Sequence, residues 1–427
     1  MIRFVVRIAL VIFGVLFPLI ILELTVRVLG LAPPAIPNPA IWDFHPELGW
    51  WHIPNSGGTF YSSFNEFEVD VQINSLGLRD DVHLDEAYLK SDTFENQYRI
   101  LILADSFAEA LQVPLEETFY KQLQNNLIEA GQATQTINAG VGSWGTDQEA
   151  LFYRLAGGRF KPDLTLLFFF TRNDVVNNYG PLEIARNGGS IQKNFFRFDE
   201  AGGLVYPEPF DPDRAYDQAE KPPPLPPAAW VTTADWLWLN SALYRWATPY
   251  LRDIPPVVRT LGPSGILGGE GRIRATHPAI PVPFFTYQTP LSPDWEIAWD
   301  LTEAILSDLR NQVEADGGQF AVVIIPAREQ VYTDEWTRTV AASAEMSNLT
   351  WDIELPNSQL HTRLARQDIL YLDLLSTFRE AATQNPSTRL YFRHDGHWTE
   401  AGHHLASETI FDFIEKHEFT NQKELGN

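Results

Sequence analysis

The sequence predicts an α/β protein with a central, mainly parallel β-sheet. Two observations carry this prediction. Short apolar runs that end at turn signals, such as Ile100–Ala104 and Leu164–Phe170, are typical of strands buried in a parallel sheet. Segments with apolar residues at helical spacing, such as Phe119–Leu127, separate these runs. Strands that alternate with helices imply right-handed crossovers and therefore parallel pairing.

The predicted elements fall into one interrupted domain over residues 69–420. The expected strands are 100–104, 134–137, 164–170, 319–325 and 369–372, and the expected helices are 119–127, 298–315 and 405–414. Residues 179–292 form an irregular insertion, rich in proline and aromatic residues, with an aromatic helical stretch at 234–250. Residues 32–68, rich in Pro, Trp and Gly, are interpreted as a tether and lead-in.

Residues 1–31 have the pattern of an N-terminal transmembrane signal anchor. Ile8–Leu22 is uncharged and follows Arg3 and Arg7, which orient the N-terminus toward the cytoplasm. Counted over residues 4–31, the apolar region is long enough to span a bilayer. A cleaved signal peptide is the alternative, but no convincing small-x-small cleavage site follows. We expect an uncleaved, single-pass anchor with the rest of the chain outside the cytoplasm.

Composition excludes several classes of function. The chain has 427 residues, with 31 basic against 55 acidic side chains and a net charge of −24. A charge of this sign argues against nucleic acid as a partner and against adhesion to anionic lipid. Cysteine is absent, so disulfides, cysteine nucleophiles and thiolate metal sites are excluded.

Ser106 lies where an α/β sheet presents side chains to ligands. It follows the predicted strand 100–104 within an Ala-Asp-Ser-Phe tetrad and precedes a helix. The carboxyl ends of parallel strands are where such sheets bind ligands. A helix N-terminus adds backbone N–H groups that can receive an oxyanion. Ser106 is therefore a candidate nucleophile, provided that a general base lies close to it.

A candidate base lies near the other end of the chain. Asp395 precedes His397 by two residues, just before the predicted helix 405–414. In a turn, the Asp395 carboxylate can reach the His397 imidazole and leave its other nitrogen free to take a proton from serine. The alternative is a solvated polar turn that caps the last helix.

Two further strand ends carry groups that can stabilise an oxyanion. Asn173 follows strand 164–170, and a side-chain amide there can donate to developing negative charge. The glycine-rich segment 138–145 follows strand 134–137, and its glycines allow backbone N–H groups to point into a cavity. The alternative for each segment is an ordinary turn without a role in a site.

Taken together, the four segments resemble the ordered blocks of the SGNH (GDSL-type) hydrolase superfamily. Ala-Asp-Ser-Phe resembles the first block, with Ala104 where Gly is usual, and Asn-Ala-Gly-Val-Gly-Ser-Trp-Gly resembles the second. Thr-Arg-Asn-Asp resembles the third. His-Asp-Gly-His-Trp resembles the last block in the D-x-H-W form of polysaccharide O-acetylation proteins. The resemblance spans about residues 70–415 and implies a three-layer, flavodoxin-like α/β/α domain.

The resemblance also implies residue roles. Ser106 is the implied nucleophile, His397 the base and Asp395 its orienting carboxylate. The implied oxyanion donors are the N–H groups of Ser106 and Ser143 and the side chain of Asn173. Gly142 or Gly145 is the alternative donor, because the second block can be aligned one or two residues differently. No metal or organic cofactor is implied.

The expected function is that of an extracytoplasmic serine esterase or O-acyltransferase working through an acyl-serine intermediate. The resemblance favours O-acetyl groups on a cell-envelope glycan as substrate, with a membrane acyl-donor protein as a possible partner. The alternatives are a lipid-ester hydrolase and a catalytically silent, membrane-tethered carbohydrate-binding protein. Retention of the Ser, Asn, Asp and His set argues against the silent form, which has no use for it.

Overall fold

The computed structural model describes residues 2–187, 192–211, 228–252, 254–261, 264, 266–267 and 280–419. The chain divides into two compact units. The first, the N-terminal unit, comprises Met1–Asn38, Phe60–Glu68 and Pro223–His277. The second, the sheet unit, comprises Pro39–Thr59, Val69–Pro222 and Pro278–Asn427 and contains every residue of the predicted site.

The sheet unit is built on a five-stranded parallel sheet. Its strands, in chain order, are β5 (Tyr98–Leu103), β6 (Thr134–Asn138), β7 (Leu164–Phe170), β10 (Gln319–Ile325) and β11 (Leu370–Asp373). Their spatial order is β11-β10-β7-β5-β6, and each neighbouring pair is parallel. This is the flavodoxin-like order, in which the direction of strand addition reverses between the first and third strands, here β5 and β7.

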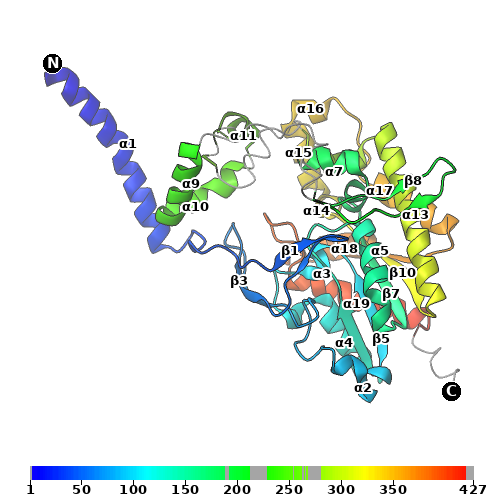
Figure 1. The fold of residues 1–427 in the computed structure, drawn as a ribbon. Coiled ribbons are helices and arrows are strands. Elements are labelled where there is room, and N and C mark those ends of the chain that lie inside the picture. Colours follow the sequence, from blue (N-terminus) through cyan, green and yellow to red (C-terminus); the bar gives the residue numbers. More distant parts are fainter. Residues whose placement is uncertain are drawn as a thin grey trace. The chain divides into compact units, whose positions relative to one another are not determined.

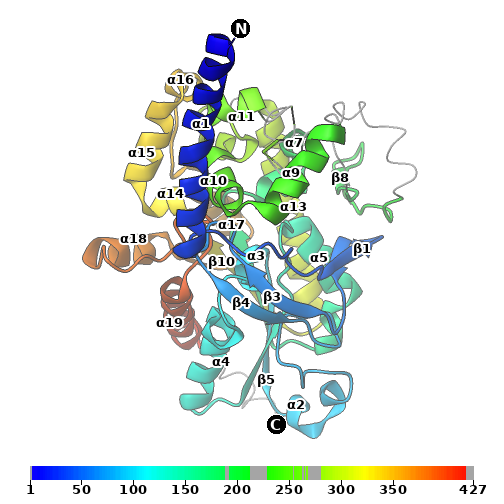
Figure 2. The same ribbon diagram turned by 90° about the vertical axis from the view of Figure 1, so that its left-hand side faces the viewer.

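Helices cover both faces of the sheet because alternate strand residues point to opposite sides. Leu101, Leu167 and Val322 pack in one core cluster with α5 (Thr146–Leu155), α13 (Pro293–Ala315) and α17 (Leu355–Arg366). Their strand neighbours, such as Ile102 and Phe168, pack in a second cluster with α4 (Phe119–Glu129), α18 (Leu375–Gln384) and α19 (Glu400–Lys416). Figures 1 and 2 show the sheet between α4 and α19 on one side and α5 and α13 on the other.

The predicted parallel sheet is confirmed, and strand boundaries agree closely. The strands expected at 164–170 and 319–325 match β7 and β10 to the residue. The expected final helix, 405–414, is the interior of the longer α19. Thr399 begins that helix as its cap, accepting a hydrogen bond from the Gly402 N–H. The helix therefore begins earlier than expected, because its first turn is polar and apolar periodicity does not detect it.

Two short strands from the lead-in also belong to the sheet unit. β1 (Trp42–His45) and β2 (Gly49–His52) pair as an antiparallel hairpin. A second pair, β3 (Gly57–Tyr61) and β4 (Glu68–Gln72), follows, and a third is formed by β8 (Arg197–Phe198) and β9 (Leu204–Val205). The first hairpin matters for the site, because its aromatic side chains contact the loops that carry the predicted oxyanion donors.

The N-terminal unit contains α1 (Ile2–Val28), α9 (Ala228–Asn240), α10 (Ala242–Arg252) and α11 (Pro255–Leu261). The aromatic stretch expected as one helix over 234–250 is thus two helices that break at Ser241. Glu23 of α1 explains the break. Its carboxylate accepts hydrogen bonds from the Ala242 and Leu243 N–H groups, both at 2.9 Å, and so caps α10 from another helix.

Among the residues that the structure describes, no helix is long and apolar enough to cross a membrane. The transmembrane helix expected over residues 1–31 is therefore not supported by the structure. The last turns of α1 carry charged groups with protein partners: Arg27 pairs with Glu23 at 2.6 Å and donates to the Asn240 carbonyl. Parts of the 179–292 insertion, including residues 188–191, 212–227 and 268–279, lie outside the described residues.

Candidate active site

The structure brings Ser106, His397 and Asp395 together from opposite ends of the chain. The His397 Nε2 atom lies 2.7 Å from the Ser106 Oγ atom, and its Nδ1 atom lies 2.6 Å from Asp395 Oδ1. The geometry is that of a nucleophile, a base and a carboxylate that orients the base. With Nδ1–H donated to Asp395, Nε2 is left as the acceptor for the serine proton.

Ser106 is held at the start of a short helix directly after β5. α3 (Ser106–Glu109) is capped by Asp105, whose carboxylate accepts a hydrogen bond of 2.9 Å from the Phe107 N–H. The Ser106 N–H makes no hydrogen bond within the described part of the chain. A free N–H at the N-terminus of a helix, beside the nucleophile, is suited to bind the oxyanion that forms there.

The charge of Asp395 prepares His397 to act as a base. Burial by itself would lower the pKa of His397, but the charge and hydrogen bond of Asp395, helped by Asp105 and Glu109, raise it above the ordinary value of 6.5. Burial likewise would raise the pKa of Asp395, but His397 and the hydrogen bonds around the carboxylate lower it. The pair therefore favours the imidazolium that forms when serine loses its proton.

The turn that carries Asp395 and His397 is closed by its own backbone. The Phe392 N–H donates to the His397 carbonyl at 2.8 Å, and Gly396 has a φ of +89°, which favours glycine. The next side chain, Trp398, is fully buried against Phe107 and anchors the turn to the core. The Gln112 amide adds a contact of 3.1 Å to His397 Nδ1.

Asn173 lies beside the nucleophile, at the end of the neighbouring strand β7. Its Nδ2 group donates to Asp105 Oδ2 at 3.0 Å, which fixes the amide and leaves one of its two N–H bonds for a ligand. β5 and β7 flank the point where strand order reverses, so Ser106 and Asn173 occupy the crevice where such sheets bind ligands. Asn173 is therefore placed to serve as a side-chain oxyanion donor.

The glycine-rich loop after β6 distinguishes among the three predicted backbone donors. Gly145 is buried, and a Cβ there would lie 2.6 Å from the Asn177 Cβ, so this glycine serves close packing. Gly142 adjoins Glu109 at the end of α3. Ser143 is exposed, has a left-handed φ of +64°, and its N–H makes no hydrogen bond among the described residues. Ser143 is thus the most exposed of the three, whereas Gly142 is half-buried and Gly145 is buried, which favours the Ser143 N–H as the donor.

A buried arginine supports the nucleophile helix and was not among the predicted site residues. The Arg79 guanidinium is 1% exposed and donates to the backbone carbonyls of Glu109, Ala110 and Val113. The Glu109 carbonyl ends α3 and the other two follow it, and the last carbonyls of a helix have no partner within it. Arg79 thus fixes the backbone that follows Ser106. The available signal was the segment Asn-Ser-Leu-Gly-Leu-Arg at residues 74–79, which lies within the span of the family resemblance.

Glu109 is a second supporting residue that sequence reasoning missed. Its buried carboxylate accepts two hydrogen bonds of 2.7 Å, one from the Trp42 indole of β1 and one from His52 Nε2 of β2. Both partners come from the hairpin assigned to the lead-in. The signal in the sequence was a charged residue inside an otherwise apolar segment, which requires buried partners.

Carboxyl groups also gather behind the oxyanion residues. Burial raises the pKa of Asp105 to about 6, against the hydrogen bonds of Phe107 and Asn173. Burial and neighbouring carboxylates raise the pKa of Glu149 and Asp174 well above their ordinary values. Neither Glu149 oxygen has a hydrogen-bond partner in the described structure. Glu149 and Asp174 therefore keep their protons to higher pH than ordinary carboxyl groups.

The remaining histidines of the last block have other roles. His403 is buried, stacks on Phe119, and accepts a hydrogen bond from the Phe119 N–H. Burial lowers its pKa to about 3, so the ring is neutral. His404 is exposed beside Glu408. Among the described residues, no cluster of His, Asp or Glu has a composition that could hold a metal ion.

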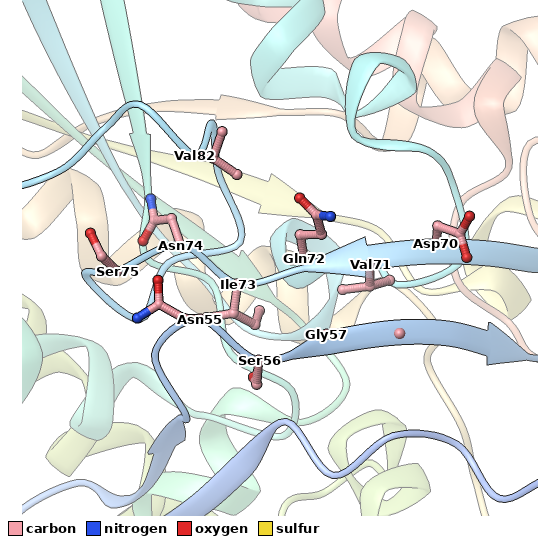
Figure 3. A pocket seen from close by; sticks show the side chains of 11 residues that line it. Asn55, Ser56, Gly57, Asp70, Val71, Gln72, Ile73, Asn74, Ser75 and Val82 are labelled. Carbon is pink, nitrogen blue, oxygen red and sulfur yellow. The ribbon is translucent and has the colours of Figure 1, made fainter.

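A cavity of about 480 Å³ lies beside β3 and β4 (Figure 3). Its wall includes Asn55, Asp70 and Gln72 but none of the predicted site residues. Asn74, another wall residue, is occupied by the backbone: its Oδ1 atom accepts from the Leu76 and Leu78 N–H groups.

A comparison with known protein families finds a match in the C-terminal part of the chain. Residues 285–426 match the model of a family described as "SGNH hydrolase-like domain, acetyltransferase AlgX". The matched segment contains Asp395 and His397, whereas Ser106 and Asn173 lie outside it. No curated protein matches the chain.

Solved structures similar to the chain include several ester hydrolases. They include an acetyl xylan esterase, AlAXEase, with 10% identity over 74% of this chain and 99% of that chain, at a TM-score of 0.35. TesA follows with 9% identity over 74% and 98%, at a TM-score of 0.35. The lipase/acylhydrolase from Enterococcus faecalis has 11% identity over 75% and 97%, at a TM-score of 0.33. With similarity this distant, the site assignments above depend on the geometry of the chain itself.

Proposed function

We propose that the chain cleaves or transfers acetyl esters through an acyl-serine intermediate. The first support is the match of residues 285–426 to an SGNH hydrolase-like domain. The observation that carries the proposal is the line of contacts from Ser106 Oγ to His397 Nε2 and from His397 Nδ1 to Asp395. If the turn at residues 395–397 only capped the last helix, His397 would not need to contact the hydroxyl of Ser106.

The first half of the proposed reaction forms the acyl-enzyme. Ser106 Oγ attacks the ester carbonyl carbon while His397 Nε2 accepts its proton, and Asp395 stabilises the imidazolium. The carbonyl oxygen becomes an oxyanion, which the N–H groups of Ser106 and Ser143 and the Asn173 amide stabilise. When the tetrahedral intermediate collapses, the alcohol leaves with the proton from His397, and the acyl group remains on Ser106.

The second half decides between hydrolysis and transfer. His397 removes a proton from the acceptor, which attacks the acyl carbon. When the tetrahedral intermediate collapses, the bond to Ser106 Oγ breaks and His397 returns the proton to the serine oxygen. Water as the acceptor yields a carboxylic acid, whereas a sugar hydroxyl yields a new ester. The family description names an acetyltransferase, which supports an acetyl group as the acyl unit. We propose a cell-envelope glycan as the acceptor or donor because the segment His-Asp-Gly-His-Trp resembles the last block of polysaccharide O-acetylation proteins.

We also propose that the enzyme acts outside the cytoplasm. The support is the sequence pattern of Arg3 and Arg7 before the uncharged stretch Ile8–Leu22. In this proposal, residues 1–31 attach the chain to the membrane, and a membrane acyl-donor protein can supply the acetyl group. Protease added to intact cells should digest the sheet unit; digestion only after lysis would overturn the location.

Turnover of a simple ester tests the enzymatic proposal. The full chain and Ser106→Ala are incubated with p-nitrophenyl acetate, and a fluorophosphonate probe is used to label the active serine. We expect turnover and labelling for the wild type and neither for Ser106→Ala, with a loss of rate of roughly a million-fold. Equal rates and no labelling in both proteins would remove the enzymatic assignment.

The acceptor is tested separately with acetylated and unacetylated glycans. Incubation of the wild type with an acetyl donor and an unacetylated oligosaccharide should yield O-acetylated product, detected by mass spectrometry. Release of free acetate alone would restrict the enzyme to hydrolysis. A panel of long-chain lipid esters serves as the contrasting substrate class, because faster turnover of these would replace the glycan with a lipid.

A further inference from the structure

We propose that Trp50 is a positioning residue for the oxyanion hole: its indole N–H fixes the peptide plane that aims the Ser143 N–H at the substrate. This inference rests on the proposed function and deepens it. Trp50 lies on β2, within the segment that the sequence assigns to the lead-in, so nothing in the family motifs points to it.

The contact that carries the proposal joins two loops distant in sequence. Trp50 Nε1 donates to the Gly142 carbonyl oxygen at 3.0 Å. The Gly142 carbonyl and the Ser143 N–H belong to one peptide unit, which is planar and trans, so the two groups point in opposite directions. Fixing the carbonyl toward Trp50 therefore fixes the N–H away from Trp50, where it has no partner among the described residues.

The orientation of this peptide needs an external restraint. Ser143 has a φ of +64°, in the left-handed region that residues with a side chain adopt at a cost. The loop therefore does not hold this shape through the preference of its own residues. Asn177 supplies a second restraint, since its Nδ2 group donates to the Ser143 carbonyl at 2.8 Å and the Trp144 carbonyl at 3.1 Å.

Trp50 is itself locked by the loop that it restrains. The Trp144 indole donates to the Trp50 carbonyl at 3.3 Å, so each tryptophan binds the backbone of the other's segment. Trp144 is fully buried and packs on Trp51 at a ring distance of 5.4 Å. On the other side of the loop, a Cβ at Gly142 would lie 2.6 Å from Glu109 Oε2. The β1–β2 hairpin thus holds Gly142 against α3, the helix that begins with Ser106.

The test compares Trp50→Phe with the wild type in the full chain. Phenylalanine retains an aromatic ring and removes the N–H. We expect kcat to fall by about ten- to a hundred-fold, less than or equal to the loss of one oxyanion donor, while KM for the ester stays close to the wild-type value. Affinity for an alkyl trifluoromethyl ketone, which forms an oxyanion when serine adds to it, should fall by the same factor.

Two further readouts separate positioning from stability. The pH dependence of kcat should be unchanged, because His397 and Asp395 keep their contacts. The melting temperature should show that the variant is fully folded at the assay temperature, so unfolding does not explain the lower kcat. Trp351→Phe is the matched control: it also removes an indole N–H that binds a backbone carbonyl, that of Met346 at 2.8 Å, in a cluster without triad residues. We expect this variant to keep its kcat.

The outcomes are decisive in both directions. An unchanged kcat in Trp50→Phe, or unchanged affinity for the ketone, overturns the positioning role while the wild-type turnover still supports the proposed function. An inactive wild type overturns the proposed function instead. If Trp50→Phe does not fold, benzothienylalanine at position 50 preserves the ring shape, replaces the N–H with sulfur and gives the same comparison.

Discussion

The two halves of the candidate active site are held in different ways. Ser106 and Asn173 follow neighbouring parallel strands, and the buried Asp105 carboxylate joins them. Asp395 and His397 instead share one turn, where their side chains are 23% and 25% exposed. The nucleophile half is thus fixed by the sheet, whereas the base half depends on local contacts within its turn and on the buried Trp398.

The difference predicts how substitutions in each half affect the site. A side chain at a strand end inherits its position from the sheet, so its neighbours are set by strand order. A side chain on a partly exposed turn keeps its position through hydrogen bonds that a single substitution removes. We therefore expect substitutions in the base half to affect the protonation of His397 and substitutions in the nucleophile half to affect oxyanion stabilisation.

Among substitutions that keep the Ser106 nucleophile, the largest effect should come from Asp395→Asn. The amide preserves the shape of the turn but favours the wrong tautomer of His397, so turnover should fall about ten-thousand-fold. The rate with p-nitrophenyl acetate measures the loss, and circular dichroism checks the fold. Near-normal turnover in a folded variant would mean that a group other than Asp395 orients the imidazole. Gln112 does not fit this role as placed, because the atom 3.1 Å from His397 Nδ1 is its amide nitrogen, which donates and would favour the same wrong tautomer.

Asn173→Ala should have a smaller effect, in the nucleophile half. It removes one oxyanion donor while backbone donors remain, so kcat should fall roughly a hundred- to a thousand-fold. The pH profile should keep its wild-type shape, in contrast to Asp395→Asn. Combining Asn173→Ala with Ser106→Ala should add almost nothing, because residues that act as a unit are not additive. A further large loss in the double variant would contradict the shared role.

The pH profile sharpens the comparison through His397. The base must be unprotonated, so kcat/KM should rise with pH through the pKa of His397, which Asp395 holds above 6.5. In Asp395→Asn the imidazolium loses its facing carboxylate, and the acid limb of the residual activity should move to lower pH. Asp105 and Glu109 also face His397 and remain in both proteins. If the acid limb of the kcat/KM profile did not move, the titrating group would not be His397.

The smallest effect is expected for Glu149→Gln, behind the nucleophile half. Burial raises the pKa of Glu149 in the folded state, so the folded protein keeps a proton that the unfolded chain releases above its ordinary pKa. Stability is therefore lost as pH rises, at about 1.4 kcal/mol for each unit of raised pKa. Glutamine removes this penalty, so the variant should be more stable than the wild type at pH 8 and nearly equal at pH 4 in urea unfolding.

The sequence by itself determined the sheet and the chemistry at its edge. Uninterrupted apolar runs such as 164–170 fit strands buried on both faces, and helical spacing between them implied parallel pairing. The sequence could predict Ser106, Asn173, Asp395 and His397 because these reactive side chains lie in short segments that can be recognised from neighbouring residues and from their order along the chain. Their distances could not be predicted, because contacts across 291 residues depend on how the strands are ordered.

Only the tertiary structure decided what supports those residues. Trp50, Arg79 and Glu109 act through backbone carbonyls or buried partners that no local pattern reveals. The same applies to the preference for Ser143 over Gly142 and Gly145, which depends on how exposed each residue is after folding. The physical reason is that a side chain's hydrogen-bonding capacity is written in the sequence, whereas its partner is selected by which backbone groups folding leaves unpaired beside it.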